Sequence, residues 1–190
     1  MAFVALLDAN VLYPQYLRDI YLRLSQAGLF QVRWSEEILN EMSRNAKEQV
    51  GSERAHQIDH TVAMMKHHFR DAMVTGYDHL IPSMTNDEKD RHVLAAAIVG
   101  RADVIVTNNV RHFPESSCAP YNIDVQEADQ FLCYQWDVED PDDVVAVLEH
   151  WAAQLESPPY TLPDLLQKML SKQVPNFGQT VLDYLEARAR

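Results

Sequence analysis

Cysteine is nearly absent from this 190-residue sequence, which contains only Cys118 and Cys133. Two cysteines do not make the disulfide framework of a small secreted protein, so we expect free thiols in a reducing cytoplasm. No apolar run approaches the roughly 20 residues that a membrane span needs. The first residues lack a basic segment and reach Asp8 too early for a signal peptide. We therefore expect a cytoplasmic protein with no membrane partner.

Basic residues are also scarce, with 16 Lys and Arg against 28 Asp and Glu and a net charge of −12. The excess of acid lies in residues 115–190, which hold 4 basic and 14 acidic residues, whereas residues 1–114 hold 12 and 14. An acidic protein is a poor general binder of nucleic acid. Because the first part is close to neutral, and bound cations would offset its acids, charge disfavours a nucleic-acid partner without excluding one.

Several catalytic motifs are missing as well. The sequence has no GxGxxG, no Walker loop and no CxxC, and it shows no Ser/His/Asp or Cys/His arrangement. These absences argue against a dinucleotide-binding enzyme, a P-loop nucleotide hydrolase and an enzyme that uses a Ser or Cys nucleophile.

Strand and helix patterns alternate over the first two thirds of the chain. Unbroken apolar runs predict buried strands at residues 2–7 and 103–107, and an alternating run predicts another at 30–34. Shorter strands are expected at 79–81 and 123–125. Helical spacing of apolar residues predicts helices around 17–24, after a Ser35 cap, and over 52–74, 87–100 and 127–134. This order predicts a parallel sheet with helices on both faces.

The last part of the chain changes character and becomes acidic. Asp140 is a natural N-cap with Pro141 at the first helical position, which predicts a helix to about residue 155. Two further helices are expected at 162–172 and 177–189. We therefore predict an α/β domain over residues 1–134 and an acidic helical extension over 135–190.

Isolated polar residues stand at the ends of the predicted buried elements. Asp8 follows the first strand, Asp87 and Asp90 begin an Ala-rich helix, and Asn108 and Asn109 follow the strand at 103–107. In a parallel sheet such positions share the edge where open α/β folds bind ligands. Carboxylates gathered there repel one another unless a cation or a proton lies between them. Because Mg²⁺ and Mn²⁺ prefer oxygen ligands, the pattern indicates metal-dependent chemistry on phosphates.

Each polar residue also has a structural interpretation when taken alone. Asp8 would cap a helix, Asp87 and Asp90 would favour a helix dipole, and Asn109 would belong to a turn. Glu41 would be a surface acid on its helix. Histidines and basic residues on one face of the helix at 52–74 form either a solvated face or a contact for phosphates; they are His56, His60, Lys66, His67, His68 and Arg70.

Four sequence strings occur in a familiar order: LLDANVLYP, WSEEILNEM, NDEKDRHVLAAAI and ADVIVTNNVRHFP. Together they resemble the PIN-domain ribonucleases, most closely the bacterial VapC-type toxins, over about residues 3–132. The resemblance implies a three-layer α/β/α sandwich with a central parallel sheet, here followed by a C-terminal helical extension. It also implies an endoribonuclease that uses Mg²⁺ or Mn²⁺ and acts as the toxin of a toxin–antitoxin pair. RNA and a cognate antitoxin would be its partners, and a homodimer is left open.

The resemblance assigns site residues one by one. Asp8, Glu41 and Asp90 match three acids of the family, and Asp87 is a common companion, so these four are the expected metal ligands. Asn109 falls where many members have a fourth acid, which removes one charge from the site. The implied catalytic residues are Asp8, Glu41, Asp90 and Asn109. His112 likewise stands where some members have an acid.

Two alternatives remain open. Asn109 favours a PIN-fold protein that binds RNA or a partner without nuclease activity. A phosphatase of the haloacid-dehalogenase type also begins with an Asp that ends a strand, but that family needs D-x-D and position 10 is Asn.

Overall fold

The structure, a computed structural model, describes residues 3–156 and 159–189. Ala2, which was expected in the first strand, lies outside these ranges. Within them, no helix combines the length and the apolar character needed to cross a membrane. Contacts divide the chain into unit 1, Met1–Pro14 with Phe30–Glu127, and unit 2, Gln15–Leu29 with Ala128–Arg190.

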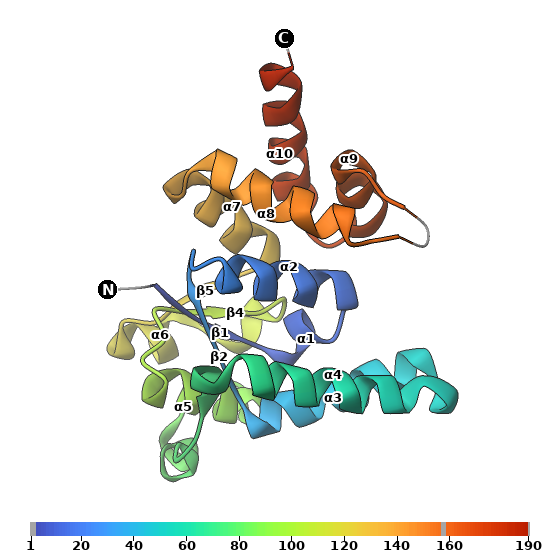
Figure 1. The fold of residues 1–190 in the computed structure, drawn as a ribbon. Coiled ribbons are helices and arrows are strands. Elements are labelled where there is room, and N and C mark those ends of the chain that lie inside the picture. The colour runs from blue at the N-terminus through green and yellow to red at the C-terminus, as the bar shows by residue number, and fades with distance from the viewer. Residues whose placement is uncertain (1–2, 157–158, 190) are drawn as a thin grey trace. The chain divides into compact units, whose positions relative to one another are not determined.

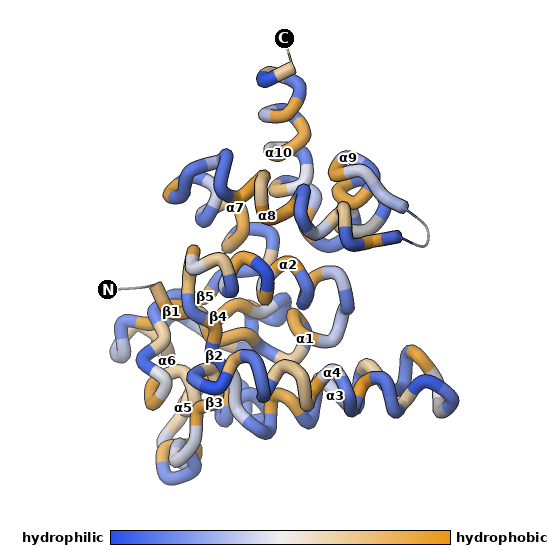
Figure 2. Tube along the Cα trace, in the orientation of Figure 1, coloured by the Kyte–Doolittle hydropathy of each residue, from blue (hydrophilic) through white to orange (hydrophobic). Residues whose placement is uncertain are grey.

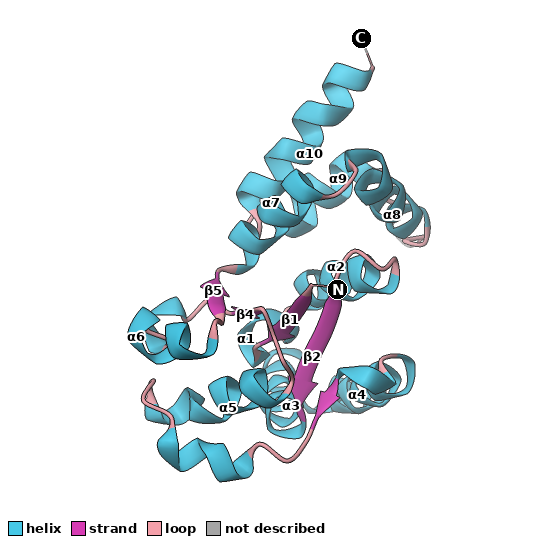
Figure 3. Ribbon diagram, turned by 90° about the vertical axis from the view of Figure 1, so that its left-hand side faces the viewer, coloured by secondary structure: helices cyan, strands magenta, loops and turns pink. Residues whose placement is uncertain are grey.

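A five-stranded sheet forms the centre of unit 1, with every strand parallel to its neighbours in the order β3-β2-β1-β4-β5 (Figure 3). The strands are β1 (Val4–Leu7), β2 (Gln31–Ser35), β3 (Met73–Val74), β4 (Val104–Val106) and β5 (Asp124–Gln126). The unbroken apolar runs of β1 and β4 are almost fully buried and appear orange in Figure 2. Such burial on both faces is typical of parallel strands. The predicted α/β fold with a central parallel sheet is confirmed.

Helices surround this sheet. The α-helices of unit 1 are α1 (Ala9–Leu12), α3 (Glu36–Val50), α4 (Ala55–His68), α5 (Arg91–Val99) and α6 (Glu115–Cys118), and α3 and α4 lie side by side (Figure 1). The predicted Ser35 cap is confirmed, because its Oγ accepts a hydrogen bond of 3.2 Å from the Ile38 N–H. Gly100 follows helix α5 as its C-cap, and a Cβ added there would lie 2.8 Å from the Val74 side chain. The Ala-rich helix with its terminal glycine therefore packs closely on the sheet.

Short 3-10 segments connect these elements. They are η1 (Ser52–Arg54), η2 (Arg70–Ala72), η3 (Asp78–Ser83), η4 (Glu88–Asp90), η5 (Val110–His112) and η6 (Ala119–Tyr121). Of the predicted site, Asp90 lies in η4 and Asn109 directly precedes η5.

Two predicted elements next to the edge strand β3 are wrong. The helix expected over 52–74 ends at His68, and residues 73–74 instead form β3, which pairs with β2 through Trp34 and Ser35. Pairing with β2 and burial of Val74 override the helical periodicity. The strand expected at 79–81 is part of the 3-10 helix η3, which contains Pro82; proline has no N–H to donate to a strand ladder.

Unit 2 consists of helices. They are α2 (Gln15–Gln26), α7 (Ala128–Val138), α8 (Pro141–Ala153), α9 (Leu162–Leu165), the π-helical turn η7 (Leu166–Leu170) and α10 (Pro175–Arg188). The predicted amphipathic helix near the N-terminus is confirmed as α2, whose Tyr21 hydroxyl donates to the Ala128 carbonyl over 2.7 Å. The predicted Asp140 cap is also confirmed. Asp129 on α7 accepts hydrogen bonds from the Asn176 and Phe177 N–H groups, so it caps the start of α10.

The contacts therefore join α2 to the C-terminal helices, although about 100 residues separate them. The expected boundary between residues 134 and 135 falls within α7. Separate behaviour of residues 1–134 and 135–190 as domains stays a prediction.

Candidate metal centre

Asp8 lies at the carboxyl end of β1, in the middle of the sheet. Its N–H donates to the Val106 carbonyl over 3.1 Å, which extends the pairing with β4 by one residue. One carboxylate oxygen, Oδ1, accepts from the Ala9 N–H over 2.6 Å and so caps α1. The capping interpretation of Asp8 is therefore correct, but it accounts for only one of the two oxygens. The residue is only 3% exposed.

The second oxygen of Asp8 is held by one side chain from α1 and one from the end of β4. Thr107 Oγ1 and Asn10 Nδ2 each donate to Asp8 Oδ2 over 2.6 Å. Asn10 Nδ2 also donates to Thr107 Oγ1 over 2.9 Å, and Asn10 Oδ1 accepts from the Asn108 N–H over 2.9 Å. These bonds fix the carboxylate in one orientation. They also tie the loop after β1 to the loop after β4.

The pKa of Asp8 is raised from 3.8 to about 6. Burial is the largest cause, because it disfavours the charged form. The hydrogen bond from Thr107 opposes this shift, while the negative charges of Asp90 and Glu41 add to it. Asp8, Asp90 and Glu41, which come from separate segments, thus interact electrostatically at the same edge of the sheet. Together these three carboxylates, which repel one another, form a set of oxygen donors suited to a divalent cation.

Asp90 precedes α5 and faces His112. It occupies the N-cap position of α5 but makes no side-chain capping bond there. Instead, Asp90 Oδ2 lies 2.6 Å from His112 Nδ1. Asp87 lies nearby, because its N–H donates to the His112 carbonyl over 3.0 Å. Single ligand atoms of Asp87, Asp90 and His112 all lie within 4.8 Å of one another.

Glu41 lies in α3 beside a buried histidine. Its Oε1 is 3.5 Å from His92 Nε2, while Glu37 Oε2 is 3.6 Å from His92 Nδ1. His92 lowers the pKa of Glu41. Burial lowers the pKa of His92, but Glu41, Glu37 and Asp8 outweigh burial and raise it overall. Neither nitrogen of His92 makes a hydrogen bond within the described part of the chain, so its contacts with Glu41 and Glu37 are electrostatic. The buried His92 therefore interacts favourably with the acids around it.

Asn109 contacts this region through its backbone. Its N–H donates to Thr107 Oγ1 over 3.0 Å, and its carbonyl accepts from the His112 N–H over 2.8 Å. These bonds shape the turn that brings His112 to Asp90. A role of the Asn109 side chain in metal binding or catalysis stays a prediction.

Three residues that hold or join the acids were not assigned these roles from the sequence. Thr107 and Asn10 orient Asp8, and His112 pairs with Asp90. The D-x-N string and the Thr directly after β4 were visible signals. The hydrogen bonds of Thr107 with Asp8 and with Asn10 link residues 99 and 97 positions apart, a pairing that no local pattern could reveal.

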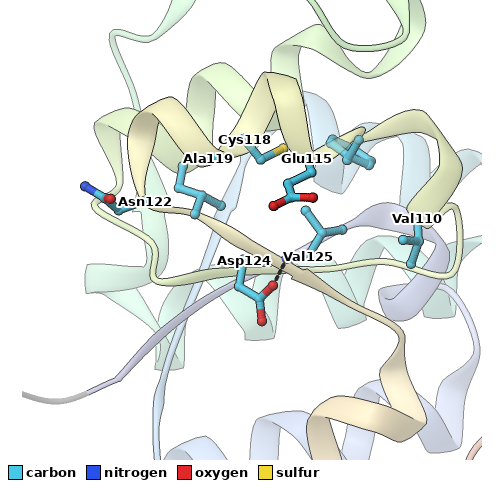
Figure 4. A pocket seen from close by; sticks show the side chains of 9 residues that line it. Val110, Glu115, Cys118, Ala119, Asn122, Asp124 and Val125 are labelled. Atoms are coloured by element: carbon cyan, nitrogen blue, oxygen red, sulfur yellow. Dashed lines mark hydrogen bonds between the residues drawn. The ribbon is translucent and has the colours of Figure 1, made fainter.

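A cavity of about 550 Å³ lies elsewhere in unit 1, between β5 and the α6–η6 segment. Its lining includes Val110, Cys118 and Val125, with the carboxylates of Glu115 and Asp124 nearby in the close view (Figure 4). None of Asp8, Glu41, Asp87, Asp90 and Asn109 is part of its lining. The predicted site residues and this cavity are therefore separate features of unit 1.

Comparisons with known proteins match both parts of the chain. The pattern of the PIN domain matches residues 4–111, and that of the VapC50 C-terminal domain matches residues 128–187. A protein of Mycobacterium tuberculosis described as "Putative ribonuclease VapC50" is 43% identical over 107 residues. That alignment covers 56% of this chain and 62% of the relative. No solved structure matches the chain.

Proposed function

Because this chain belongs to the PIN-domain family and resembles its VapC branch, we propose that it is an endoribonuclease that cleaves RNA phosphodiester bonds with Mg²⁺ or Mn²⁺. The observation that carries the proposal is the environment of the Asp8 carboxylate. It is buried, and the negative charges of Asp90 and Glu41 add to the rise in its pKa. Burying a charge among like charges is costly, and a bound cation would repay that cost.

The residues present suit a hard divalent ion. Asp8 and Asp90 would hold it, with Glu41 and Asp87 completing the acidic set. When bound, the ion would polarise a phosphate oxygen and lower the pKa of a water molecule. Oxygen donors from separate elements, each fixed by the fold, provide the preorganised site that such chemistry needs.

The chain's own residues have distinct roles in this proposal. Thr107 and Asn10 keep Asp8 oriented, so that its carboxylate does not turn away when RNA binds. Glu41 would orient the attacking water or accept its proton. Asn109 would offer a hydrogen bond but no charge.

Basic residues lie next to the acids in the sequence, and Arg91 has a buried Nε with no partner within the described residues. We propose that Arg91 contacts a phosphate.

We further propose that the protein is the toxin of a toxin–antitoxin pair, acts in the cytoplasm and binds a cognate antitoxin. The support is the similarity of both parts of the chain to VapC50. The acidic surface of unit 2 suits a basic partner, and a homodimer is compatible with the same account.

A second candidate function is RNA or partner binding without cleavage. Asn109 favours it, because the site then has one charge fewer than the four-acid pattern.

Cleavage of a structured RNA separates the two functions. The purified chain is incubated with labelled RNA in Mg²⁺, in Mn²⁺ and in excess chelator, and RNA binding is measured in parallel. Products that form only with a metal support the nuclease. Binding with no cleavage under any of these conditions would support the second candidate instead.

A further inference from the structure

We propose that His112 supplies a nitrogen ligand to the metal, together with Asp87 and Asp90, and that the site therefore selects Mn²⁺ or Co²⁺ over Mg²⁺. The proposal rests on the proposed function and makes it more specific, since it names the residue that decides which ion is held. It concerns this chain's histidine, at a position where some members of the family have an acid.

The spacing of the three side chains is close to that of one coordination shell. Their ligand atoms lie within 4.8 Å of one another. In an octahedral shell with bonds of about 2.1 Å, neighbouring ligand atoms are about 3 Å apart and opposite ones about 4.2 Å. The 2.6 Å between His112 Nδ1 and Asp90 Oδ2 is slightly too short for two such ligands, so this contact would open by a few tenths of an ångström. The His112 and Asp90 side chains are 24% and 15% exposed, which leaves access for water and substrate.

The backbone holds His112 firmly in this place. Its carbonyl accepts from the Asp87 N–H over 3.0 Å, and its N–H donates to the Asn109 carbonyl over 2.8 Å. The next residue, Phe113, is only 2% exposed and anchors the segment in the core. The backbone at His112 is therefore positioned by the fold, and the contact with Asp90 orients the imidazole. Preorganisation of this kind lowers the cost of forming a metal site.

The alternative is that His112 only orients Asp90 by a hydrogen bond. Arg111 Nε lies 3.4 Å from His112 Nε2, as a donor would. That contact suits a neutral ring with its proton on Nδ1, which would then donate to Asp90. Coordination through Nδ1 requires the proton to lie on Nε2, and the Arg111 contact must break. The contact is long and exposed, so its loss costs little.

The two roles differ in their consequence for metal choice. Mg²⁺ and Mn²⁺ both prefer oxygen ligands, but affinity for a site that includes an imidazole nitrogen rises along the transition series from Mn²⁺ to Co²⁺ and the later ions, whereas Mg²⁺ gains little from that nitrogen. A nitrogen ligand therefore favours transition ions selectively. A residue that only orients Asp90 would support Mg²⁺ and Co²⁺ alike, because both ions would use the same carboxylate.

The test uses the full chain with the metal ion alone. Electron spin-echo spectroscopy of the Mn²⁺-loaded protein should show coupling to a directly bound nitrogen, and His112→Gln should abolish it. In calorimetric titrations, His112→Gln should weaken Co²⁺ binding by roughly tenfold or more, the scale seen when partners of a metal site are removed. Mg²⁺ binding should change by less than about threefold, and His112→Asp should strengthen it. His60→Gln, which replaces an exposed histidine of α4, is the matched control.

Several outcomes would overturn the proposal. They are nitrogen coupling that persists in His112→Gln, equal weakening of Mg²⁺ and Co²⁺ binding, or failure of the wild-type chain to bind Mn²⁺. Circular dichroism verifies the fold of each variant, and His112→Asn replaces His112→Gln if the latter is unfolded. RNA cleavage distinguishes this failure from failure of the proposed function. A wild-type chain that cleaves RNA but shows no nitrogen coupling would remain a nuclease without a histidine ligand.

Discussion

The raised pKa of Asp8 predicts how the stability of the metal-free protein depends on pH. The ordinary pKa of an aspartate carboxyl is 3.8, and that of Asp8 in the folded chain is about 6, so the folded state binds this proton more tightly than the unfolded state. The protonated carboxyl therefore contributes stability that is complete below pH 3.8 and is lost as pH rises through 6. At 1.36 kcal/mol per pKa unit, the total contribution is about 3 kcal/mol.

The substitution Asp8→Asn removes this titration. Between pH 5 and pH 8 the wild type should lose about 1.4 kcal/mol that the variant keeps, the part of the shift that titrates in this window. The variant also loses hydrogen bonding, because its amide nitrogen must face a donor, either Ala9 N–H on one side or Asn10 and Thr107 on the other. That loss costs about 1–3 kcal/mol and does not depend on pH. The absolute difference at one pH is thus uninformative, and its change with pH is the prediction.

The assay is urea unfolding in excess chelator at pH 5, 6, 7 and 8, followed by tryptophan fluorescence and circular dichroism. Asp71→Asn is the matched control, because this exposed acid precedes β3 and so lies at the opposite edge of the sheet. The free energy of unfolding of Asp8→Asn relative to the wild type should rise by about 1.4 kcal/mol from pH 5 to pH 8. A difference that stays constant, or that falls, would refute the electrostatic account of Asp8.

Three further predictions concern the site and unit 2. Asn109→Asp should tighten Mg²⁺ or Mn²⁺ binding in calorimetry, because affinity for hard cations rises with ligand charge; an unchanged affinity would mean that position 109 faces away from the metal. Thr107→Val removes a hydrogen bond to Asp8 without changing side-chain size, so it should weaken Mn²⁺ binding roughly 10–100-fold, and wild-type affinity would contradict this role. Limited proteolysis should leave the part beyond residue 136 intact in the wild type, whereas Asp129→Ala, which uncaps α10, should speed its digestion; rapid loss from the wild type would rule out a folded extension.

The strands at the centre of the sheet were predictable because burial on both faces leaves a local signature. The runs of β1 and β4 are continuous and apolar. A polar residue follows each of them directly, Asp8 after β1 and Thr107 after β4. The edge strand β3 has only two residues and follows a helix directly. Its apolar residues continue the helical period, so only pairing with β2 identifies it. The grouping of α2 with the C-terminal helices was equally hidden, since the Tyr21–Ala128 bond spans 107 residues.

The candidate site was predictable to a similar extent. Asp8 could be identified as a site residue because a charge directly after a buried strand is costly unless it is paired, hydrogen-bonded or bound to a metal. His112 could be noted only as a departure from a pattern, whereas the structure brings it to Asp90. The hydrogen bonds of Thr107 and Asn10 depend on how β1 and β4 align, which is a property of the assembled sheet. Sequence thus identified the acids, and the fold identified what holds them.

The most direct measurement of the central claim is the ratio of RNA cleavage rates for Asp8→Asn and the wild type in saturating Mn²⁺, with Asp71→Asn as control. The account predicts that Asp8→Asn cleaves more slowly by orders of magnitude while Asp71→Asn keeps the wild-type rate, with both variants folded. Equal rates for Asp8→Asn and the wild type, or wild-type cleavage that persists in excess chelator, would contradict a metal-dependent nuclease centred on Asp8.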